Sequence, residues 1–273
     1  MAKQEVEIAV CALQRSGHHC VMDWLQAALR GKYGNTIRYI NWVNEFLPQI
    51  DPFNTNTHPT DDSHKCGHGD RGKPRKVLIY NFEDVGLYMM RSMEMVAEKF
   101  NGKSKKRYTV LIMRDFYNLL ASRMERTRKG KPLDHPYNAL VGLWLEHAKA
   151  AQKTGDYANL ENLVTINYNR WFSEAGYRKV LCDILKCKYT EDTMDHVHLA
   201  GNGSSFTGTR GNGRNLRVLD RWETFKDDPE YIKIVNNKAI QRLNTAIFGW
   251  CLKKEKVGLV KKAQISTVQK KRK

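Results

Sequence analysis

The segment from Gln14 to His19 carries the residue types best suited to anion chemistry. It reads QRSGHH, follows a short apolar run, and precedes an amphipathic pattern built on Val21, Trp24 and Leu25. A strand, a glycine-containing loop and a helix in this order direct backbone N–H groups and a helix N-terminus at a phosphate-like anion. Arg15 adds a fixed charge with fork geometry. The segment therefore predicts an anion-binding loop.

A second set of polar residues follows another apolar run. Arg114 comes at the end of that run, Asp115 can cap the helix after it, and Asn118, Ser122 and Arg126 then recur at intervals of four. An arginine with a nearby hydroxyl is a good phosphate clamp. Taken alone, however, the pattern is more typical of an amphipathic helix with a solvated face.

Strand and helix patterns alternate along the chain, which predicts the elements that must position these residues. We expect strands near 8–13 and over Thr36–Phe46, Lys76–Phe82, Tyr108–Met113 and Leu163–Asn167. We expect helices after His19 and over Gly86–Phe100, Phe116–Arg128, Tyr137–Lys153, Phe172–Lys186 and Asp228–Lys253. The repetition favours an α/β fold with a doubly wound, mainly parallel sheet flanked by helices, similar to P-loop NTPases. Tyr108–Met113 is the most hydrophobic strand and should lie centrally, and the ligand site should lie at the carboxyl ends of the strands.

Composition and charge bound the remaining possibilities. The 273 residues carry a formal charge of +17, of which +8 lies in residues 252–273, so the rest carries +9 (17 minus 8). We therefore expect one α/β domain over 1–252 and a basic tail over 253–273, and nucleic-acid binding only through that tail. The charged start gives no signal peptide, no apolar run is long enough to span a bilayer, and the six cysteines are scattered. These features predict a reduced, cytoplasmic location with free thiols.

Four motifs in order resemble the sulfotransferases that use 3'-phosphoadenosine 5'-phosphosulfate (PAPS). The first loop, RSGHH, resembles the 5'-phosphosulfate loop of that family, and Arg114 with Ser122 matches its 3'-phosphate pair in kind and spacing. The segment after 165, INYNRW, is similar to the element whose tyrosine lies by the adenine. The segment from Gly203 to Trp222 resembles the late loop that closes over the 3'-phosphate. Together the motifs span about residues 7 to 250.

The resemblance implies a role for each matching residue. Arg15 would stabilise charge on the bridging and leaving oxygens, and Glu83, after the strand ending at Phe82, would be the general base. Asp84 is a neighbouring candidate for that base, and helix capping is an equally good interpretation of both acids; His18 and His19 are further bases. His18 and His19 stand where the family has two hydroxyl residues, and we expect them to contact the ligand rather than only fill the loop. The implied co-substrate contacts are Arg15, Ser16, Gly17, His18, His19, Cys20, Arg114, Ser122, Tyr168, Arg210 and Gly211.

Two other functions share parts of this pattern. A P-loop nucleotide kinase has the same strand–loop–helix layout but requires Gly-x-x-x-x-Gly-Lys-Ser/Thr, and neither the lysine nor the metal-binding hydroxyl is present at that spacing. A basic nucleic-acid-binding protein on the same scaffold is the second alternative. We expect no metal, because His58, His64, Cys66 and His68 fit no standard zinc spacing and are more typical of a polar loop. The acceptor is not predicted.

Overall fold

A computed structural model describes residues 4–40, 76–131, 135–157, 160, 162–197, 204–208 and 211–252. Several predicted features lie outside these residues. They are the second half of the Thr36–Phe46 strand, the cluster of His58, His64, Cys66 and His68, the loop residue Arg210, and the basic tail from 253 onward. Within the described part of the chain, no helix is long and apolar enough to cross a membrane.

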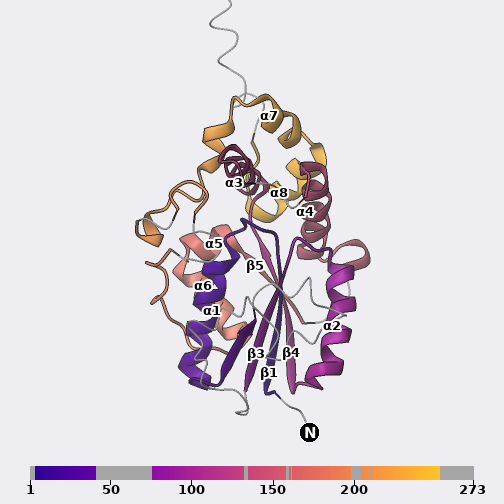
Figure 1. The fold of residues 1–273 in the computed structure, drawn as a ribbon, viewed down its shortest axis with the longest axis vertical. Coiled ribbons are helices and arrows are strands. Elements are labelled where there is room, and N and C mark those ends of the chain that lie inside the picture. Colours follow the sequence, from indigo (N-terminus) through magenta and orange to yellow (C-terminus); the bar gives the residue numbers. More distant parts are fainter. Residues whose placement is uncertain are drawn as a thin grey trace, which may run out of the picture.

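A parallel β-sheet forms the centre of the molecule (Figure 1). Its strands are β1 (Val6–Ala12), β2 (Ile37–Ile40), β3 (Val77–Glu83), β4 (Lys106–Met113) and β5 (Leu163–Asn167). They are arranged in the order β2-β3-β1-β4-β5, and the four neighbouring pairs are all parallel. The predicted parallel α/β sheet is confirmed, although the middle strand is β1, and the more apolar β4 lies one place from it.

Helices cover both faces of the sheet, as the doubly wound prediction requires. On one face, α1 (His18–Tyr33), α5 (Tyr168–Ser173) and α6 (Ala175–Leu185) pack against Ile8, Val10 and Ala12 of β1. The alternate side chains Ala9 and Cys11 join the core on the other face. That core contains α2 (Leu87–Asn101), α3 (Phe116–Arg128), α4 (Tyr137–Ala151), α7 (Pro229–Val235) and α8 (Lys238–Phe248). An apolar strand buried on both faces is what parallel sheets require.

Two predicted helices are each divided in the structure. The segment predicted as Phe172–Lys186 begins earlier, at Tyr168, and extended backbone at Glu174 separates α5 from α6. The segment predicted as Asp228–Lys253 is α7 and α8, because the side chain of Asn237 accepts hydrogen bonds from the backbone of Ala239 and Ile240 and so begins a new helix. Helical periodicity continues across both breaks, so hydrophobic spacing alone did not show them.

A cluster of upper helices stands over the carboxyl ends of the strands. Figure 1 draws α3, α7 and α8 beyond the end of the sheet opposite the N-terminus. The first of these, α3, starts three residues after β4, and the carboxylate of Asp115 accepts the backbone N–H of Asn118 to cap it. Ten residues of α3 are buried, Asn118, Ser122 and Arg123 among them. These polar side chains of α3 therefore do not form a solvated face. They make hydrogen bonds with groups inside the protein.

At the opposite end of the sheet, β1 holds a buried carboxylate. Glu7 is fully buried and accepts hydrogen bonds from the hydroxyl of Tyr80 at 2.7 Å and that of Ser104 at 2.5 Å. Arg107 of β4 forms an ion pair with it at 3.0 Å. Burial, followed by the charge of Glu7, raises the pKa of Tyr80 well above its usual value. This cluster joins β1, β3 and β4 far from the loop at residues 14–19.

Replacing Glu7 should therefore destabilise the fold strongly. The change Glu7→Ala leaves Arg107 and Tyr80 without their buried acceptor, and we expect a loss of about 2–4 kcal/mol, since the arginine side chain keeps some solvent exposure. Glu98→Ala is the matched control, because Glu98 pairs with the same arginine at 3.2 Å but is 38% exposed. It should cost less than about 0.5 kcal/mol. Urea unfolding measures the stability of both variants. Equal losses would contradict the role of Glu7 as the buried acceptor that joins the three strands.

Candidate functional site

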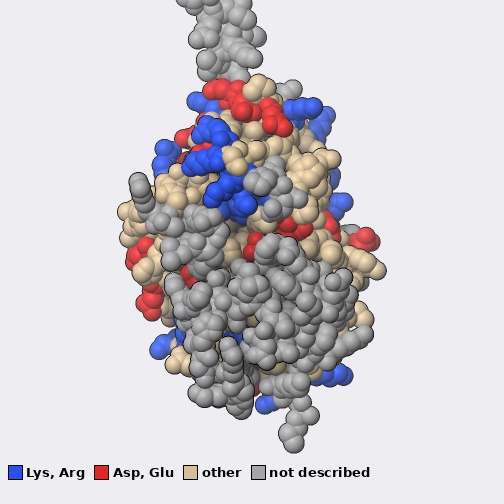
Figure 2. Space-filling model, viewed as in Figure 1, with Lys and Arg blue, Asp and Glu red and all other residues tan. Residues whose placement is uncertain are grey.

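A cavity opens at the carboxyl ends of the strands, which is where parallel α/β sheets bind ligands. Its walls come from the exits of β1, β3, β4 and β5, from the first turn of α1, and from the late segment after residue 196. Figure 2 shows lysine and arginine side chains gathered on this end of the molecule, where Figure 1 draws α3. The lining residues are Gln14, Arg15, Gly17, His18, His19, Cys20, Glu83, Arg114, Arg126, Tyr168, Val197, Ser204, Leu216, Val218 and Arg221.

The loop after β1 has the conformation of an anion-binding turn. Arg15 and Gly17 both have positive φ, 67° and 84°, so the backbone folds back tightly before α1 starts at His18. Gly17 leaves no room for a side chain, since a Cβ there would lie 2.3 Å from the ring of Tyr168. The first residues of α1 line the cavity, so the helix N-terminus, with its partial positive charge, faces the ligand space.

A buried ion pair fixes the backbone on which this loop stands. Asp84, just after β3, accepts the backbone N–H of Gln14 at 2.9 Å and pairs with the guanidinium of Arg123 from α3. The same arginine donates through Nε to the carbonyl of Gln14 at 2.9 Å. Asp84 itself has a positive φ of 55°, which an aspartate tolerates only where its surroundings hold it. Asp84 is therefore a buttress of the loop, which leaves Glu83 as the acid that lines the cavity.

Arg114 and Ser122 are adjacent in space, as their spacing predicted. The guanidinium of Arg114 donates to Ser122 Oγ at 3.3 Å and to the carbonyl of Arg15 at 3.0 Å, and it also bonds the carbonyl of Val218. A second guanidinium, that of Arg221, donates to the same Ser122 oxygen at 2.8 Å. Two arginines thus converge on one buried hydroxyl, which is a strong clamp for a phosphate group.

Several arginine side chains lie around the cavity, and their charges lower the pKa of neighbouring arginines. Burial, followed by the charges of Arg126, Arg114 and Arg123, lowers the pKa of Arg15 to about 10. Burial and then the charge of Arg114 lower the pKa of Arg221 to about 9. Both groups remain cationic at neutral pH, so the cavity has a strong positive potential. A polyanionic ligand would reduce this repulsion, because each bound anionic group offsets part of the excess charge.

Glu83 stands beside both histidines of the loop. His18 Nε2 lies 3.0 Å from Glu83 Oε1, and His19 Nε2 lies 3.9 Å from the same oxygen. The amide of Asn81 donates to that oxygen as well, at 3.2 Å. Burial acts to raise the pKa of Glu83, but the charge and hydrogen bond of His18 outweigh it and lower the pKa to about 2. The carboxylate is therefore ionised at neutral pH.

The other predicted contacts are distributed unevenly around the cavity. Tyr168 is buried and lies under the guanidinium of Arg114, 5.2 Å from the ring centre, and burial raises the pKa of Tyr168 to about 12. Ser16 is buried behind the loop, with its hydroxyl 3.4 Å from His18 Nδ1. Gly211 is exposed and is not among the residues that line the cavity. The roles of these residues as ligand contacts stay predictions.

Several cavity residues were not predicted from the sequence as site residues. Arg221 lies within the Gly203–Trp222 segment that resembles the late loop, and Arg126 belongs to the polar residues that recur along α3; both line the cavity. Ser204, whose hydroxyl accepts from Arg221 at 3.0 Å, belongs to the same late segment. The resemblance of the Gly203–Trp222 segment to the late loop of the family was the signal that pointed to this part of the chain. The apolar lining residues Val197, Leu216 and Val218 gave none.

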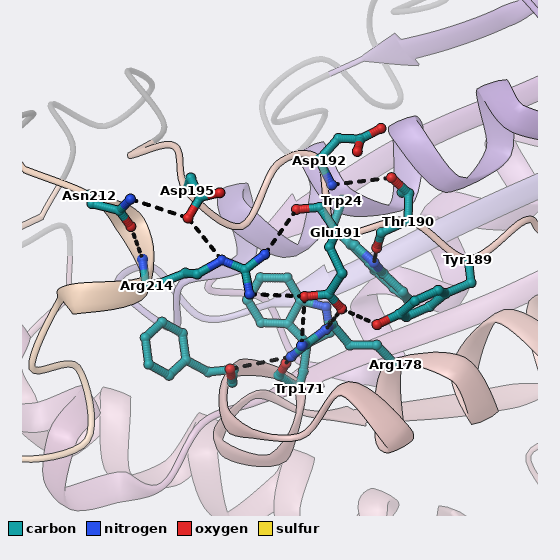
Figure 3. A network of polar contacts seen from close by, with 11 residues as sticks. Trp24, Trp171, Arg178, Tyr189, Thr190, Glu191, Asp192, Asp195, Asn212 and Arg214 are labelled. Carbon is teal, nitrogen blue, oxygen red and sulfur yellow. Dashed lines mark hydrogen bonds and ion pairs between the residues drawn. The ribbon is translucent and has the colours of Figure 1, made fainter.

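A network of ion pairs holds the late segment against α6 (Figure 3). The carboxylate of Glu191 lies between two guanidinium groups, that of Arg178 at 2.8 Å and that of Arg214 at 3.1 Å. Arg214 also pairs with Asp195 at 2.8 Å. Because Arg178 is buried and belongs to a core helix, this network fixes residues 191–195 and 214, which flank the cavity residues of the late segment.

Comparison with known proteins identifies the fold. No protein-family model and no curated protein matches the sequence. Mouse sulfotransferase SULT7A1 complexed with PAP is similar over 89% of this chain and 90% of its own, with a TM-score of 0.50 and 12% identity. The sulfotransferase domain of the Synechococcus olefin synthase is similar over 92% and 96%, with a TM-score of 0.53 and 14% identity. This chain has the sulfotransferase fold. The predicted resemblance is thereby confirmed for the architecture.

Gly17 is the residue of this sulfotransferase fold whose replacement should most directly distort the loop. In Gly17→Ala the new methyl group meets Tyr168 and the left-handed backbone is strained, so we expect a loss of about 2–4 kcal/mol. Gly249→Ala is the control, because Gly249 is also left-handed, with φ of 76°, but has nothing within 4 Å of a built Cβ. It should cost only about 1–2 kcal/mol. Chemical denaturation compares them, and a Gly17 variant as stable as the control would refute the close packing.

Proposed function

We propose that this protein transfers a sulfuryl group from PAPS to a hydroxyl or amine acceptor. The observation that carries the proposal is the convergence of Arg114 and Arg221 on Ser122, with the loop of Arg15 and the α1 N-terminus at the same cavity. This gives two separate anion-binding sets within one cavity, which suits a ligand with anionic groups at both ends. The sulfotransferase fold and a structural neighbour complexed with PAP support the same proposal.

The two ends of PAPS have distinct partners in this proposal. The 3'-phosphate is bound by Arg114, Ser122 and Arg221, and the hydroxyl of Ser204 completes that set through Arg221. The 5'-phosphosulfate is bound by the loop N–H groups, Arg15 and the start of α1. Tyr168 packs on Gly17 and under Arg114, between the two anion sets, where its ring can face the adenosine.

The reaction then proceeds as an in-line displacement at sulfur. The acceptor oxygen or nitrogen forms a bond to sulfur while the bond from sulfur to the bridging oxygen breaks, and the electron pair leaves with the 5'-phosphate. Charge builds on the bridging and leaving oxygens, and Arg15, which remains cationic, stabilises it there. Removing such a group costs on the order of 10²–10³ in rate. Catalysis in this type of transfer depends mainly on positioning and electrostatics.

Glu83 accepts the acceptor's proton in this mechanism. It lines the cavity at the end of β3 and is ionised at neutral pH. Because its low pKa makes it a weak base, it takes the proton only once the acceptor atom has begun to bond to sulfur and has become acidic. His18 stands against the same carboxylate oxygen and stabilises its charge. His18 is itself buried, with its second ring nitrogen beside Ser16, which makes it a positioning residue for Glu83.

The kinase alternative and the proposed reaction differ in the nucleotide that is bound. We expect calorimetry to show binding of 3'-phosphoadenosine 5'-phosphate (PAP) and weaker binding of ATP, since Arg114 and Arg221 form a set for a 3'-phosphate. In Arg114→Met and Arg221→Met, losing charge-assisted hydrogen bonds should weaken PAP binding by about 10- to 100-fold. A preference for ATP would favour the kinase instead.

Arg217→Met is the control for these two variants. Arg217 belongs to the same late segment, and its side chain is 73% exposed, where it pairs with Asp220 and Glu223. The substitution removes the same charge without touching the cavity, so PAP affinity should change by less than about twofold. Equal weakening in all three variants would show a general charge effect and overturn the assignment of the 3'-phosphate set.

The base assignment predicts that Glu83→Gln separates catalysis from nucleotide binding. The amide cannot accept the proton, so kcat should fall by about 10²- to 10⁴-fold while PAP affinity stays close to that of the unmodified protein. The assay is PAP release from PAPS, with an acceptor found by screening hydroxyl and amine compounds. Glu174→Gln, a change in an exposed carboxylate paired with Arg170, should leave the rate unchanged. A Glu83→Gln enzyme with full activity would exclude Glu83 as the base.

A further inference from the structure

Three potential metal ligands meet at one point beside the cavity. His18, His19 and Glu83 each offer one donor atom, and these atoms all lie within 4.8 Å of one another. The two histidines are consecutive at the start of α1, while Glu83 comes from the end of β3. The rings of the two histidines are in contact, with centroids 4.0 Å apart, although neighbouring helical side chains normally point in different directions. Both Nε2 atoms are instead directed at the same carboxylate.

The distances between these atoms suit a small transition-metal ion. Ligand atoms held about 2.0–2.2 Å from a tetrahedral zinc ion lie about 3.3–3.5 Å from one another. The observed separations from Glu83 Oε1, 3.0 Å to His18 and 3.9 Å to His19, lie on either side of that value. All three donor atoms lie within 4.8 Å of one another, so binding one ion requires the two imidazoles to move closer together. Two imidazoles and a carboxylate are a ligand set for zinc or cobalt rather than magnesium or calcium.

The neighbours of the three residues support the same orientation. Ser16 Oγ lies 3.4 Å from His18 Nδ1, so the other ring nitrogen, Nε2, is the one left toward Glu83. A metal-binding histidine normally has its second nitrogen held in this way. Asn81 donates to Glu83 at 3.2 Å, and Tyr39 donates to Asn81 at 3.2 Å, which fixes the carboxylate from behind. Buried side chains thus orient two of the three donors before any ion arrives.

We propose that His18, His19 and Glu83 bind one divalent transition-metal ion, with a fourth position open to the cavity. The single negative charge of Glu83 offsets only part of the ion's charge, and Arg15 is near, so the fourth ligand should be an anion or hydroxide. If the protein is a sulfotransferase as proposed above, the bound ion takes as ligands the proton-accepting carboxylate and both loop histidines. Metal binding and sulfuryl transfer would then exclude each other.

Cobalt is the direct probe of this site, because bound Co²⁺ has an absorption spectrum that reports its ligands. The full chain, treated with a chelator and then titrated with Co²⁺ without nucleotide, should bind one equivalent, and Zn²⁺ but not Mg²⁺ should displace it. His19→Gln and Glu83→Gln should each weaken Co²⁺ binding by more than about 100-fold, which exceeds the effect of losing an outer partner. Ser16→Ala should weaken it by about 10-fold.

Two controls separate this site from other histidines and from loss of folding. His135→Ala removes an exposed histidine of the described residues, and a variant with His58, His64, Cys66 and His68 all changed to alanine removes the other histidine cluster of the sequence. Both should retain full Co²⁺ binding, and all variants should show a single cooperative thermal unfolding transition without metal. Unchanged binding in His19→Gln and Glu83→Gln, or its loss in the four-residue variant, would overturn the proposal.

The same titration distinguishes this inference from the proposed function. Because Co²⁺ binding is measured without nucleotide or acceptor, a protein that fails to bind PAP can still bind the metal at these three residues. Conversely, a protein that binds PAP and transfers sulfuryl groups, but whose Co²⁺ binding does not depend on His19 and Glu83, retains the proposed function and has no such metal site.

Discussion

The guanidinium of Arg114 joins the three segments on which the candidate site depends. It bonds the carbonyl of Arg15 in the first loop, the hydroxyl of Ser122 on α3, and the carbonyl of Val218 in the late segment. These segments are about one hundred residues apart in sequence, and the directional hydrogen bonds of one guanidinium hold them together. A buried arginine with five donors can hold several acceptors at once, which a lysine cannot do in the same fixed geometry.

The same arrangement explains why buried positive charges persist beside one another. Taking Arg15, Arg114 and Arg221 out of water is unfavourable, and the lowered pKa of each shows that burial outweighs the nearby acids. The fold compensates elsewhere, through the apolar clusters on both faces of the sheet. The apolar core thus stabilises a fold in which several positive charges lie close together around one cavity. Such a cavity is suited to a polyanion, which offsets their repulsion.

The sequence was sufficient for the parallel sheet, because period and apolar length distinguish strand from helix in β1, β4 and β5. The pairing of Arg114 with Ser122 was predicted from the family resemblance, and it forms because Arg114 lies just before α3 while Ser122 lies within that helix. The helix breaks at Glu174 and Asn237 were missed because each is a local change of backbone conformation within a continuous apolar pattern, with a side-chain cap only at Asn237. Arg126 and Arg221 were missed as cavity residues for a different reason: their positions depend on how α3 and the late segment pack, which local patterns do not encode.

His18 and His19 carry the clearest difference between this chain and the hydroxyl pair expected in its first loop. A hydroxyl at His18 could not reach across to β3, whereas the imidazole spans the gap to Glu83 and joins the first loop to that carboxylate. This contact links the residues proposed to bind phosphosulfate with the residue proposed to accept the proton. A change at one is therefore felt at the other, because they share one hydrogen-bonded pair and not merely one cavity. The exchange of two hydroxyls for two imidazoles is thus a change in how the loop and the base are coupled.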